Sequence, residues 1–343
     1  MGDQAFNLHD FQRLAEARMD PAQYAFYAGG NADEVTLREN EAAWARRRLR
    51  PRVLVDVSTI DTRTTLLGTE VAYPFGIAPT AQHGFAHPDG ECVTARVAGD
   101  AGVVFCASTQ STRTLEDIAA SCGGPSWFQL YVQDNTGPRT ETLVERAAAA
   151  GYQAIVLTVD LAVPGRRERE WRAGFDWDAW PRGNFPEPAP DEPPLPLTFS
   201  WRDLAWLRKV TPLPLVLKGI MTADDAQLAV EHGADAVWVS NHGGRQLDRS
   251  PATIDVLEEV VDAVDGRAEV YIDGGVRRGQ DVATALALGA TAVFVGRPVL
   301  FALACQGEAG VRSAIGILGE ELRYVMALLG VTSIDGITRA HVT

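Results

Sequence analysis

The sequence predicts a (β/α)8 barrel, the TIM-barrel fold, preceded by a helical N-terminal segment. Three observations favour this fold. Eight short apolar runs recur between residues 75 and 299, alanine-rich amphipathic segments separate them, and polar or glycine residues follow each run. A doubly wound sheet is the alternative, but eight repeats and the lack of a GxGxxG motif after the first run count against it.

The first 70 residues come before the predicted barrel. Residues 10–18 and 21–27 have helical patterns, and a glycine turn at 28–30 leads into another helix. The segment 51–74 is predicted to be extended, with a hairpin that closes the bottom of the barrel. We therefore expect one domain over residues 1–343, with the barrel itself at 75–330.

The eight predicted strands share a buried apolar body and a polar or glycine-containing end. They are residues 75–81, 102–108, 125–132, 154–160, 213–219, 236–243, 269–275 and 292–299. The connection after the fourth strand, about 161–202, is much longer than the others. It is rich in proline, acidic residues and tryptophan, which predicts a lid-like insertion; an insertion without a function is the alternative.

Composition restricts the class of partner. Lys+Arg 31 against Asp+Glu 45 gives a net charge of −14, which argues against nucleic acid or an anionic membrane as a partner. No apolar run has the length of a membrane helix, and the N-terminus lacks a signal pattern. The four cysteines show neither metal nor CxxC spacing, so we expect reduced thiols, no metal and a cytoplasmic location.

The ends of the predicted strands carry an unusual number of hydrogen-bonding side chains. Active sites of such barrels form where the strands end, because the βα loops meet there. The side chains are Thr80, Ser108, Gln129, Tyr131, Thr158, Asp160, Lys218, Ser240, His242, Arg245, Asp273 and Arg297. A barrel selected only for stability has no physical need for so many, and we expect a polar active site.

The most informative stretch is SNHGGR at residues 240–245, which begins in the polar end of the sixth predicted strand. Glycines let the backbone adopt positive φ or approach a ligand closely. His242 can take a proton near neutral pH, and the Arg245 guanidinium can bind a carboxylate with two parallel hydrogen bonds. A helix N-terminus with a surface histidine and arginine is the alternative.

The last two strands predict a phosphate site. Strand seven is followed by DGGVRRG at residues 273–279, and strand eight by Gly296 and Arg297. Glycines expose backbone N–H groups and arginine adds a bidentate cation. The loops after strands seven and eight form the recurrent phosphate site of this fold, so both signals point to the same place.

With these motifs in place, the chain resembles the FMN-dependent 2-hydroxy acid oxidase and dehydrogenase family, which includes glycolate oxidase, lactate oxidase and mandelate dehydrogenase. The resemblance covers nearly the whole chain. It rests on AGG..DE.TL.EN, IAPTA with AHP.GE, WFQLYV, LTVD followed by GRRERE, LKGI, SNHGGRQLD, DGGVRRG and FVGRP. It implies FMN as the cofactor and a small 2-hydroxy acid as the substrate.

The resemblance also implies a role for each matching residue. His242 is then the base, Asp160 its partner, Arg245 and Arg167 bind the substrate carboxylate, and Tyr131 bonds the substrate hydroxyl. Lys218 lies by the flavin and stabilises the reduced ring. The implied cofactor-binding set is Ala78, Pro79, Thr80, Ala81, Ser108, Gln129, Thr158, Lys218, Ser240, Asp273, Gly274, Gly275, Arg277, Gly296 and Arg297.

Two substrate-pocket positions depart from the family pattern. Phe26 stands where the family usually has a tyrosine that donates to the substrate carboxylate, and Gln110 stands where glycolate oxidases often have a large aromatic residue. Both changes favour a bulkier or aromatic substrate; neutral drift is the alternative. Ala81, where some relatives have glycine, favours an oxidase.

The expected function is therefore flavin-dependent oxidation of a 2-hydroxy acid to the 2-oxo acid, with O2 as the second electron acceptor. Oxidative decarboxylation and a dehydrogenase with another acceptor are alternatives, and a barrel that binds FMN or phosphate without turnover is a third. The resemblance further implies a homo-oligomer, a tetramer or an octamer.

Overall fold

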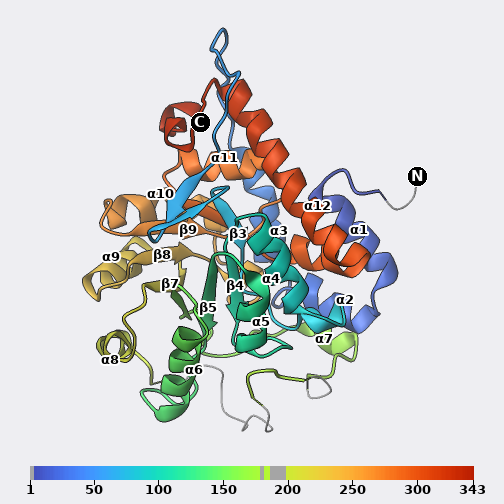
Figure 1. The fold of residues 1–343 in the computed structure, drawn as a ribbon, viewed down its shortest axis with the longest axis vertical. Coiled ribbons are helices and arrows are strands. Elements are labelled where there is room, and N and C mark those ends of the chain that lie inside the picture. Colours follow the sequence, from blue (N-terminus) through green and yellow to red (C-terminus); the bar gives the residue numbers. More distant parts are fainter. Residues whose placement is uncertain (1–3, 178–180, 186–197) are drawn as a thin grey trace.

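The computed structural model describes residues 4–177, 181–185 and 198–343, and it confirms the predicted barrel (Figure 1). Eight parallel strands close in the order β10-β3-β4-β5-β6-β7-β8-β9, so neighbours in the chain are neighbours in the barrel. The strands are β3 (Phe75–Ile77), β4 (Phe105–Ser108), β5 (Ser126–Leu130), β6 (Ile155–Thr158), β7 (Leu215–Ile220), β8 (Ala236–Val239), β9 (Glu269–Ile272) and β10 (Ala292–Val295).

Helices surround the barrel on the outside (Figure 1). They are α4 (Glu91–Asp100), α5 (Leu115–Cys122), α6 (Pro138–Ala149), α8 (Leu204–Val210), α9 (Ala223–Glu231), α10 (Thr253–Val264), α11 (Gly279–Ala287) and α12 (Arg297–Leu329). The last of these is kinked at Gly307, whose φ of 56° is not helical. Short 3-10 turns occur at η1 (Trp44–Arg46), η2 (His83–Phe85), η3 (Trp201–Asp203), η4 (His242–Gly244), η5 (Ile334–Gly336) and η6 (Arg339–His341).

The core has two parts because each strand is buried on both faces. One part lies between the strands and the outer helices, and the other fills the barrel with Trp127, Trp238 and other aromatic side chains. The predicted hairpin is present as β1 (Thr64–Leu66) and β2 (Thr69–Val71). Leu66 packs within the inner cluster, and the Leu67 N–H donates to the Glu269 carboxylate at 2.9 Å. The hairpin therefore closes the N-terminal end of the barrel, as predicted.

The N-terminal segment forms α1 (Leu8–Arg18), α2 (Pro21–Ala28) and α3 (Val35–Ala42). The first helix begins two residues before the predicted start because Asn7 caps it, accepting from the Asp10 N–H at 3.0 Å. Figure 1 shows α1 beside α12, and the Arg18 guanidinium donates to the Cys305 carbonyl at 2.9 Å. These contacts fix the N-terminal helices on the barrel.

The insertion after β6 contains one short helix, α7 (Glu168–Arg172). Between this helix and η3, the described residues contain no further helix or strand, and residues 178–180 and 186–197 of the predicted lid lie outside the described part. Among the helices that the structure describes, none has the length and apolar character of a membrane span.

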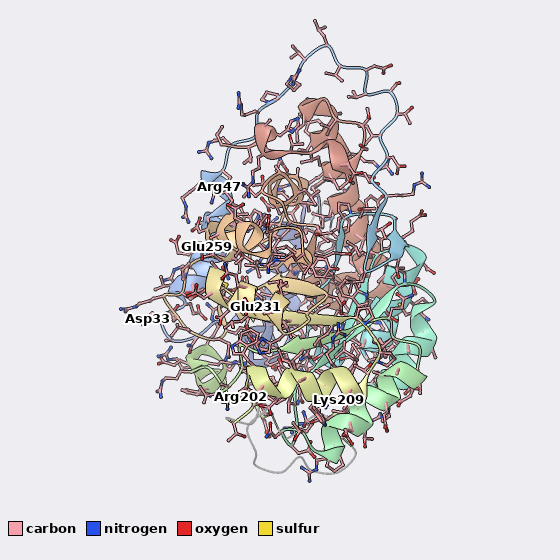
Figure 2. All side chains as sticks on the ribbon, turned by 90° about the vertical axis from the view of Figure 1, so that its left-hand side faces the viewer. Asp33, Arg47, Arg202, Lys209, Glu231 and Glu259 are labelled. Carbon is pink, nitrogen blue, oxygen red and sulfur yellow. The ribbon has the colours of Figure 1, made fainter. Side chains whose placement is uncertain are left out.

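The two lysines of the chain have different environments. Lys209, on the last turn of α8, is exposed on the outer surface together with Asp33 and Glu259 (Figure 2). Lys218 is only 4% exposed, within β7 at its C-terminal end. A buried charge requires compensation, so we expect acidic or hydrogen-bonding groups near Lys218 at that end of the barrel.

Candidate active site

A cavity of about 560 Å³ opens at the C-terminal ends of the strands. Of the predicted site residues, those that line it are Phe26, Ala78, Pro79, Thr80, Ala81, Ser108, Gln110, Gln129, Tyr131, Thr158, Arg167, Lys218, His242, Arg245, Asp273, Gly274, Gly275, Arg277, Gly296 and Arg297. Asp160 and Ser240 do not line it, but each is hydrogen-bonded to a residue that does. The structure therefore brings the predicted residues together in one place.

His242 lies at the centre of a hydrogen-bonded set. Its Nδ1 is 2.8 Å from the Asp160 Oδ1, and its Nε2 is 3.3 Å from the Tyr131 hydroxyl. A carboxylate at Nδ1 keeps the proton on that nitrogen, which leaves Nε2 with a lone pair toward the cavity. The arrangement is that of a general base with an orienting carboxylate.

Burial and charge set the protonation of this pair. Burial lowers the pKa of His242 below 6.5, although the charge of Asp160 and its hydrogen bond oppose that shift. Burial alone would raise the pKa of Asp160, but the charge of His242 and its hydrogen bond bring it below 3.8. At neutral pH the imidazole is therefore neutral beside an ionised carboxylate, which is the state a base requires.

The turn that carries the imidazole has a strained backbone. His242 itself has a φ of 59°, and Gly243 follows with a φ of 63°. Residues other than glycine rarely adopt this left-handed conformation, and such strain persists only where the surrounding structure stabilises it. The left-handed φ of Gly243 favours glycine, and a Cβ there would also lie 2.5 Å from a terminal guanidinium nitrogen of Arg297, which would have to move.

Arg297 is one of the groups that hold this turn. Its guanidinium donates to the carbonyls of Tyr27 at 2.7 Å, Gly243 at 2.9 Å and Gly29 at 2.8 Å. Burial, together with the charge of Arg245, lowers the pKa of Arg297 to about 9. The guanidinium thus joins the start of α12 to the His242 turn and the end of α2.

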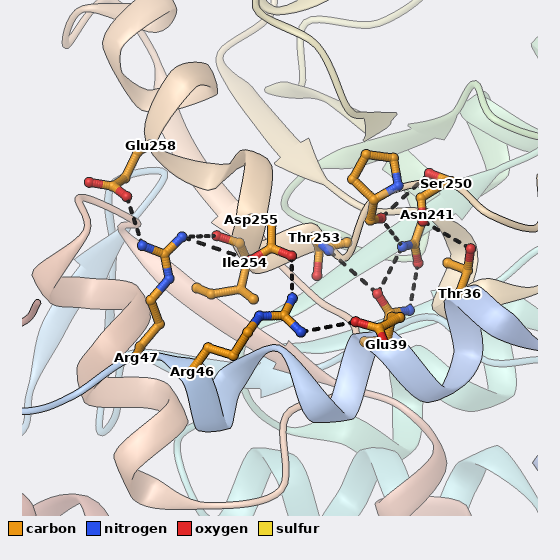
Figure 3. Close-up of polar contacts among 12 residues, drawn as sticks. Thr36, Glu39, Arg46, Arg47, Asn241, Ser250, Thr253, Ile254, Asp255 and Glu258 are labelled. Carbon is orange, nitrogen blue, oxygen red and sulfur yellow. Dashed lines mark hydrogen bonds and ion pairs between the residues drawn. The ribbon is translucent and has the colours of Figure 1, made fainter.

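Helix α3 is hydrogen-bonded to residues 241 and 250, which flank the His242 turn. The Asn40 and Asn241 amides donate to each other at 2.8 Å in both directions, and the Thr36 hydroxyl donates to the Ser250 carbonyl at 3.0 Å. Figure 3 shows this network continuing along α3 and η1 to Arg46, which bonds Asp255 at 2.6 Å. The N-terminal segment is therefore part of the framework of the site.

Lys218 is compensated by two neighbours at the ends of β8 and β9. Its Nζ donates to the Ser240 hydroxyl at 2.8 Å and lies 3.2 Å from Asp273. Burial alone would lower the pKa of Lys218, but the charges of Asp273 and Asp160 raise it above 10.5. Lys218 therefore remains a cation in the cavity wall.

The polar residues of β4, β5 and β6 form a ladder across the cavity wall. Gln129 accepts from the Ser108 hydroxyl at 3.2 Å and donates to the Thr158 hydroxyl at 3.0 Å. In the loop after β3, the Thr80 hydroxyl is 2.7 Å from Nε2 of the buried His83. Such a wall offers hydrogen bonds to a flat polar ring.

The far end of the cavity is suited to a phosphate group. Gly274 and Gly275 have φ of 98° and 79°, and a Cβ at Gly275 would lie 1.8 Å from the Asn40 carbonyl oxygen. Arg277 is 6% exposed and bonds Glu41 at 2.5 Å, while its Nε is buried with no partner among the described residues. Exposed backbone N–H groups beside a guanidinium form an anion site.

Two arginines face the other end of the cavity. Arg245 donates from Nη1 to the carbonyls of Phe26 at 2.7 Å and Gly29 at 3.1 Å, and from Nη2 to the Glu170 carboxylate at 2.8 Å. The Nε of Arg167 is 4.0 Å from the same carboxylate oxygen. Burial and the charge of Arg245 lower the pKa of Arg167 to about 10, so the Arg167 guanidinium is charged at neutral pH.

Phe26 belongs to a group of aromatic rings beside these arginines. It stacks on Phe175 with ring centres 4.7 Å apart and meets Trp177 and Phe85 edge-on at 4.8 Å and 5.5 Å. The guanidinium carbon of Arg245 lies 5.1 Å from the Phe26 ring centre. The wall at this position is apolar, without a hydroxyl donor from residue 26.

Several residues of the site escaped sequence reasoning. Glu170 is the clearest, since it lines the cavity and binds Arg245. Its signal was its spacing, because it lies three residues after Arg167 and both can face the same side of a short helix. Trp177 and His83 were also missed, and neither has a motif that distinguishes it from an ordinary aromatic or core residue.

Comparisons with known proteins agree on one family. The family model described as FMN-dependent dehydrogenase matches residues 15–343. Glycolate oxidase 1 of Oryza sativa subsp. indica is 46% identical over 351 residues, which cover 98% of this chain and 95% of that protein. A peroxisomal (S)-2-hydroxyacid oxidase of Arabidopsis thaliana is 47% identical over 352 residues, covering 99% and 97%.

Solved structures give the same result for the fold. A crystal structure of mandelate oxidase superposes with a TM-score of 0.93 at 42% identity, covering 98% of both chains. The structure of mandelate oxidase with benzoyl-formic acid superposes with a TM-score of 0.92 at the same identity and coverage. The barrel, the N-terminal helices and the described part of the insertion are thus shared with these proteins.

Proposed function

The chain belongs to the FMN-dependent dehydrogenase family, and from that premise we propose that it oxidises an (S)-2-hydroxy acid to the corresponding 2-oxo acid. One observation carries this proposal: His242, which is hydrogen-bonded to Asp160, lines the same cavity as Arg245 and Arg167. A base and a carboxylate-binding pair in one cavity suit a substrate with a reactive carbon next to a carboxylate.

The residues present fit FMN. Gly275 and the buried Nε of Arg277 would hold the phosphate, and the ladder from Ser108 through Gln129 to Thr158 would hold the ring and the ribityl chain. Lys218 would add a positive charge beside the ring. When bound, FMN supplies the two-electron acceptor for the oxidation.

The protein residues then share the remaining tasks. Arg245 and Arg167 bind the substrate carboxylate and orient C2 toward His242, while Tyr131 donates a hydrogen bond to the substrate hydroxyl. His242 takes a proton at Nε2 as the C2–H bond breaks, and Asp160 stabilises the resulting imidazolium. In a carbanion route this proton comes from C2, and in a hydride route it comes from the substrate hydroxyl, so both routes require the base.

A substrate with a bulky or aromatic side chain is the finer part of the proposal. The support is the aromatic group around Phe26 and the position of Gln110 in the cavity wall. Apolar rings favour a packed side chain over a small acid, and an amide suits a side chain with its own hydroxyl. Mandelate or a hydroxylated relative fits this description better than glycolate or L-lactate.

We propose O2 as the acceptor that reoxidises the enzyme, on the basis of Ala81 in the cavity wall. The purified holoenzyme should consume one O2 and form one H2O2 and one 2-oxo acid per substrate. Oxidative decarboxylation would give an acid one carbon shorter together with CO2, and a dehydrogenase would turn over only with an added acceptor. Product analysis separates the three.

The experiment that tests the function starts from purified protein. Denaturation should release one FMN per chain, and an anaerobic 2-hydroxy acid should bleach the flavin absorbance. His242→Ala should slow this reduction by about 10²-fold or more while FMN stays bound, whereas His341→Ala in η6 should not. A His242→Ala variant that reduces FMN at the parent rate would contradict the assignment of the base.

We also propose that the chain forms a homo-oligomer, since apolar side chains are exposed together at one end. Val53, Leu54 and Val55 are 81%, 103% and 41% exposed, and Leu328 is 49% exposed. The Arg52 N–H donates to the Leu328 carbonyl at 3.0 Å, so the loop and the end of α12 are adjacent. Light scattering should show dissociation of Leu54→Asp, with the exposed Leu247→Asp unchanged.

A further inference from the structure

His83 is a buried histidine that the proposed reaction does not use. It lies in η2, is 0% exposed and meets Phe105 edge-on with ring centres 6.1 Å apart. Each ring nitrogen has a hydroxyl partner: Nε2 is 2.7 Å from the Thr80 hydroxyl, and Nδ1 is 3.0 Å from the Thr94 hydroxyl. Thr80 lines the cavity, whereas His83 and Thr94 do not. The imidazole therefore connects α4 to the cavity wall.

A buried carboxylate fixes the backbone of the turn that carries this imidazole. The Glu91 side chain accepts from the His83 N–H at 3.0 Å, the Thr112 N–H at 2.8 Å and the Arg113 N–H at 3.2 Å. It thereby joins the loop after β3 to the loop after β4. The two hydroxyl contacts then fix the ring itself, so protein contacts alone set its direction.

Burial makes this imidazole neutral. It lowers the pKa of His83 below 6.5, although the charge of Glu91 and a hydrogen bond to the Thr80 backbone oppose that shift. A neutral imidazole has one N–H, so one nitrogen donates and the other accepts. A backbone carbonyl only accepts, and Nε2 is the nitrogen beside Thr80. The proton therefore belongs on Nε2, and Nδ1 accepts from the Thr94 hydroxyl.

This proton position determines what Thr80 presents to the cavity. A hydroxyl group has one O–H donor and two acceptor lone pairs. When Nε2–H donates to the Thr80 oxygen, the Thr80 proton stays free for a ligand, and the bond it accepts strengthens the bond it donates. With the proton on Nδ1, Thr80 would donate to Nε2 and would offer a ligand only lone pairs. The tautomer of His83 thus sets whether the cavity wall donates or accepts at Thr80.

We propose that His83 is a positioning residue that keeps the Thr80 hydroxyl a hydrogen-bond donor toward bound FMN and thereby favours the reduced flavin. Reduction adds negative charge to the polar atoms of the ring, and a donor directed at developing negative charge stabilises it. The inference rests on the proposed function only in that FMN occupies the cavity, and it requires no particular substrate or second electron acceptor.

The midpoint potential of the flavin tests this role, because it reports the ratio of the affinities for reduced and oxidised FMN. It is measured on the holoenzyme by equilibration with a reference dye during slow anaerobic reduction. Thr80→Val, which removes the donor, should lower the ratio of reduced to oxidised flavin at a fixed potential by about tenfold, equivalent to a midpoint about 30 mV lower. His83→Leu should lower this ratio by about threefold or more, since the hydroxyl loses the N–H that orients it.

Three further variants show whether His83 acts through Thr80. In the Thr80→Val background, His83→Leu should change the ratio by less than about twofold, because the group it orients is gone. His83→Gln, whose amide can donate to Thr80, should stay within about twofold of the parent. His232→Leu is the matched control and should keep the parental midpoint, since the His232 ring contacts the Leu228 carbonyl at 2.9 Å and does not line the cavity.

The direction of the His83→Leu shift decides between the possible roles. A higher midpoint would show that Thr80 donates to His83, and it would overturn the proposal. A loss of packing that weakens oxidised and reduced FMN equally leaves the midpoint unchanged, so an unchanged midpoint would show that His83 is only structural and would overturn the proposal as well.

A direct measurement of the tautomer serves if His83→Leu does not fold. NMR of the parent holoenzyme with isotope-labelled histidine locates the His83 proton, and the His83→Gln variant identifies the signal. A proton on Nδ1 would contradict the proposal. An enzyme inactive on every 2-hydroxy acid would leave the midpoints measurable, so that result would overturn the proposed function alone.

Discussion

At the scale of single residues, the proposed reaction depends on how His242 is placed and charged. A neutral imidazole is required, and burial supplies it by lowering the pKa of His242 below 6.5. Asp160 acts in the opposite direction on the same pKa but stabilises the imidazolium once it forms. In the proposed reaction, burial keeps His242 unprotonated at neutral pH, and Asp160 stabilises the imidazolium that forms when His242 takes a proton.

This balance gives a prediction for the pH dependence. The unprotonated base is the active form, so kcat/KM should fall as the pH is lowered through a pKa below 6.5. Asp160→Asn removes a group that raises this pKa, so the acidic limb should move to lower pH. The plateau rate should also fall by about 10²-fold or more, because the imidazolium loses its partner.

Stopped-flow reduction of the bound flavin across the pH range measures both effects. Asp100→Asn, which changes a surface aspartate paired with Arg312, is the matched control and should keep the parental profile. An acidic limb of Asp160→Asn at the parental pH or above it would refute the assigned role of Asp160.

Phe26 gives a second prediction at this scale. Arg245 lies against its ring, and a tyrosine would place a hydroxyl donor near the carboxylate-binding arginines. Phe26→Tyr should raise kcat/KM for glycolate and L-lactate by roughly tenfold, equivalent to one charge-assisted hydrogen bond of about 1.4 kcal/mol. Bulky aromatic acids should gain less, because packing already holds them.

The neighbouring Phe175→Tyr is the control for this change. Phe175 stacks on Phe26 at 4.7 Å, so it gains the same hydroxyl in the same aromatic group but at a different position. It should leave the small acids unimproved. A parent enzyme that already prefers glycolate or lactate would show that the argument from Phe26 is wrong.

At the scale of secondary-structure elements, close contacts between helices fix the spacing of the strands they connect. Helices α4 and α5 approach each other at Gly99, where a Cβ would lie 1.6 Å from the Cys122 carbonyl oxygen and 3.0 Å from the Gly124 nitrogen. Backbone atoms cannot give way as a flexible side chain can. This glycine is therefore required by packing and not by its backbone angles.

Two glycine substitutions test this reading. Gly99→Ala should lower the free energy of unfolding by about 1–3 kcal/mol or more, because α4 and α5 must separate. Gly316→Ala, on α12 where a Cβ meets nothing within 4 Å, should raise it by about 0.5–1 kcal/mol through helix propensity. Denaturant titration of both variants gives the comparison. Equal effects would show that the α4–α5 contact is not tight.

At the scale of the whole molecule, the barrel places several buried charges at one end. Arg277 and Lys218 are 6% and 4% exposed, and each faces the cavity. A ligand that satisfies them binds the folded state only, so it stabilises the whole chain by mass action. FMN should have this effect because Arg277 would hold its phosphate and Lys218 would lie beside its ring.

Removing FMN should therefore lower the melting temperature. Adding FMN back at about 100 times its Kd should stabilise the protein by about 2.7 kcal/mol. Riboflavin at the same concentration, which lacks the phosphate, should stabilise it less because it forms no bonds at the Gly275 and Arg277 site. Calorimetry in phosphate-free buffer measures the difference, and equal stabilisation by both flavins would argue against the phosphate site at Gly275 and Arg277.

The sequence alone determined the fold and most of the site. Strand period, buried apolar runs and their polar ends are local signals, so eight strands and the residues at their ends could be placed without coordinates. The family resemblance placed Arg167, which lies beyond the strand ends, in the site as well. In a barrel of this kind the strand ends meet at one face, which is why residues as distant as Thr80 and Arg277 line one cavity.

The partners of those side chains depend on how the chain folds in three dimensions. The Arg297 guanidinium, expected at the phosphate, donates to three carbonyls, one of them at Tyr27, 270 residues away. Glu170 binds Arg245 across 75 residues, and Phe26 packs against Phe175. Such contacts depend on distances between segments that no local pattern encodes. An arginine or a glutamate gives the same local pattern whichever partner it contacts in the folded protein.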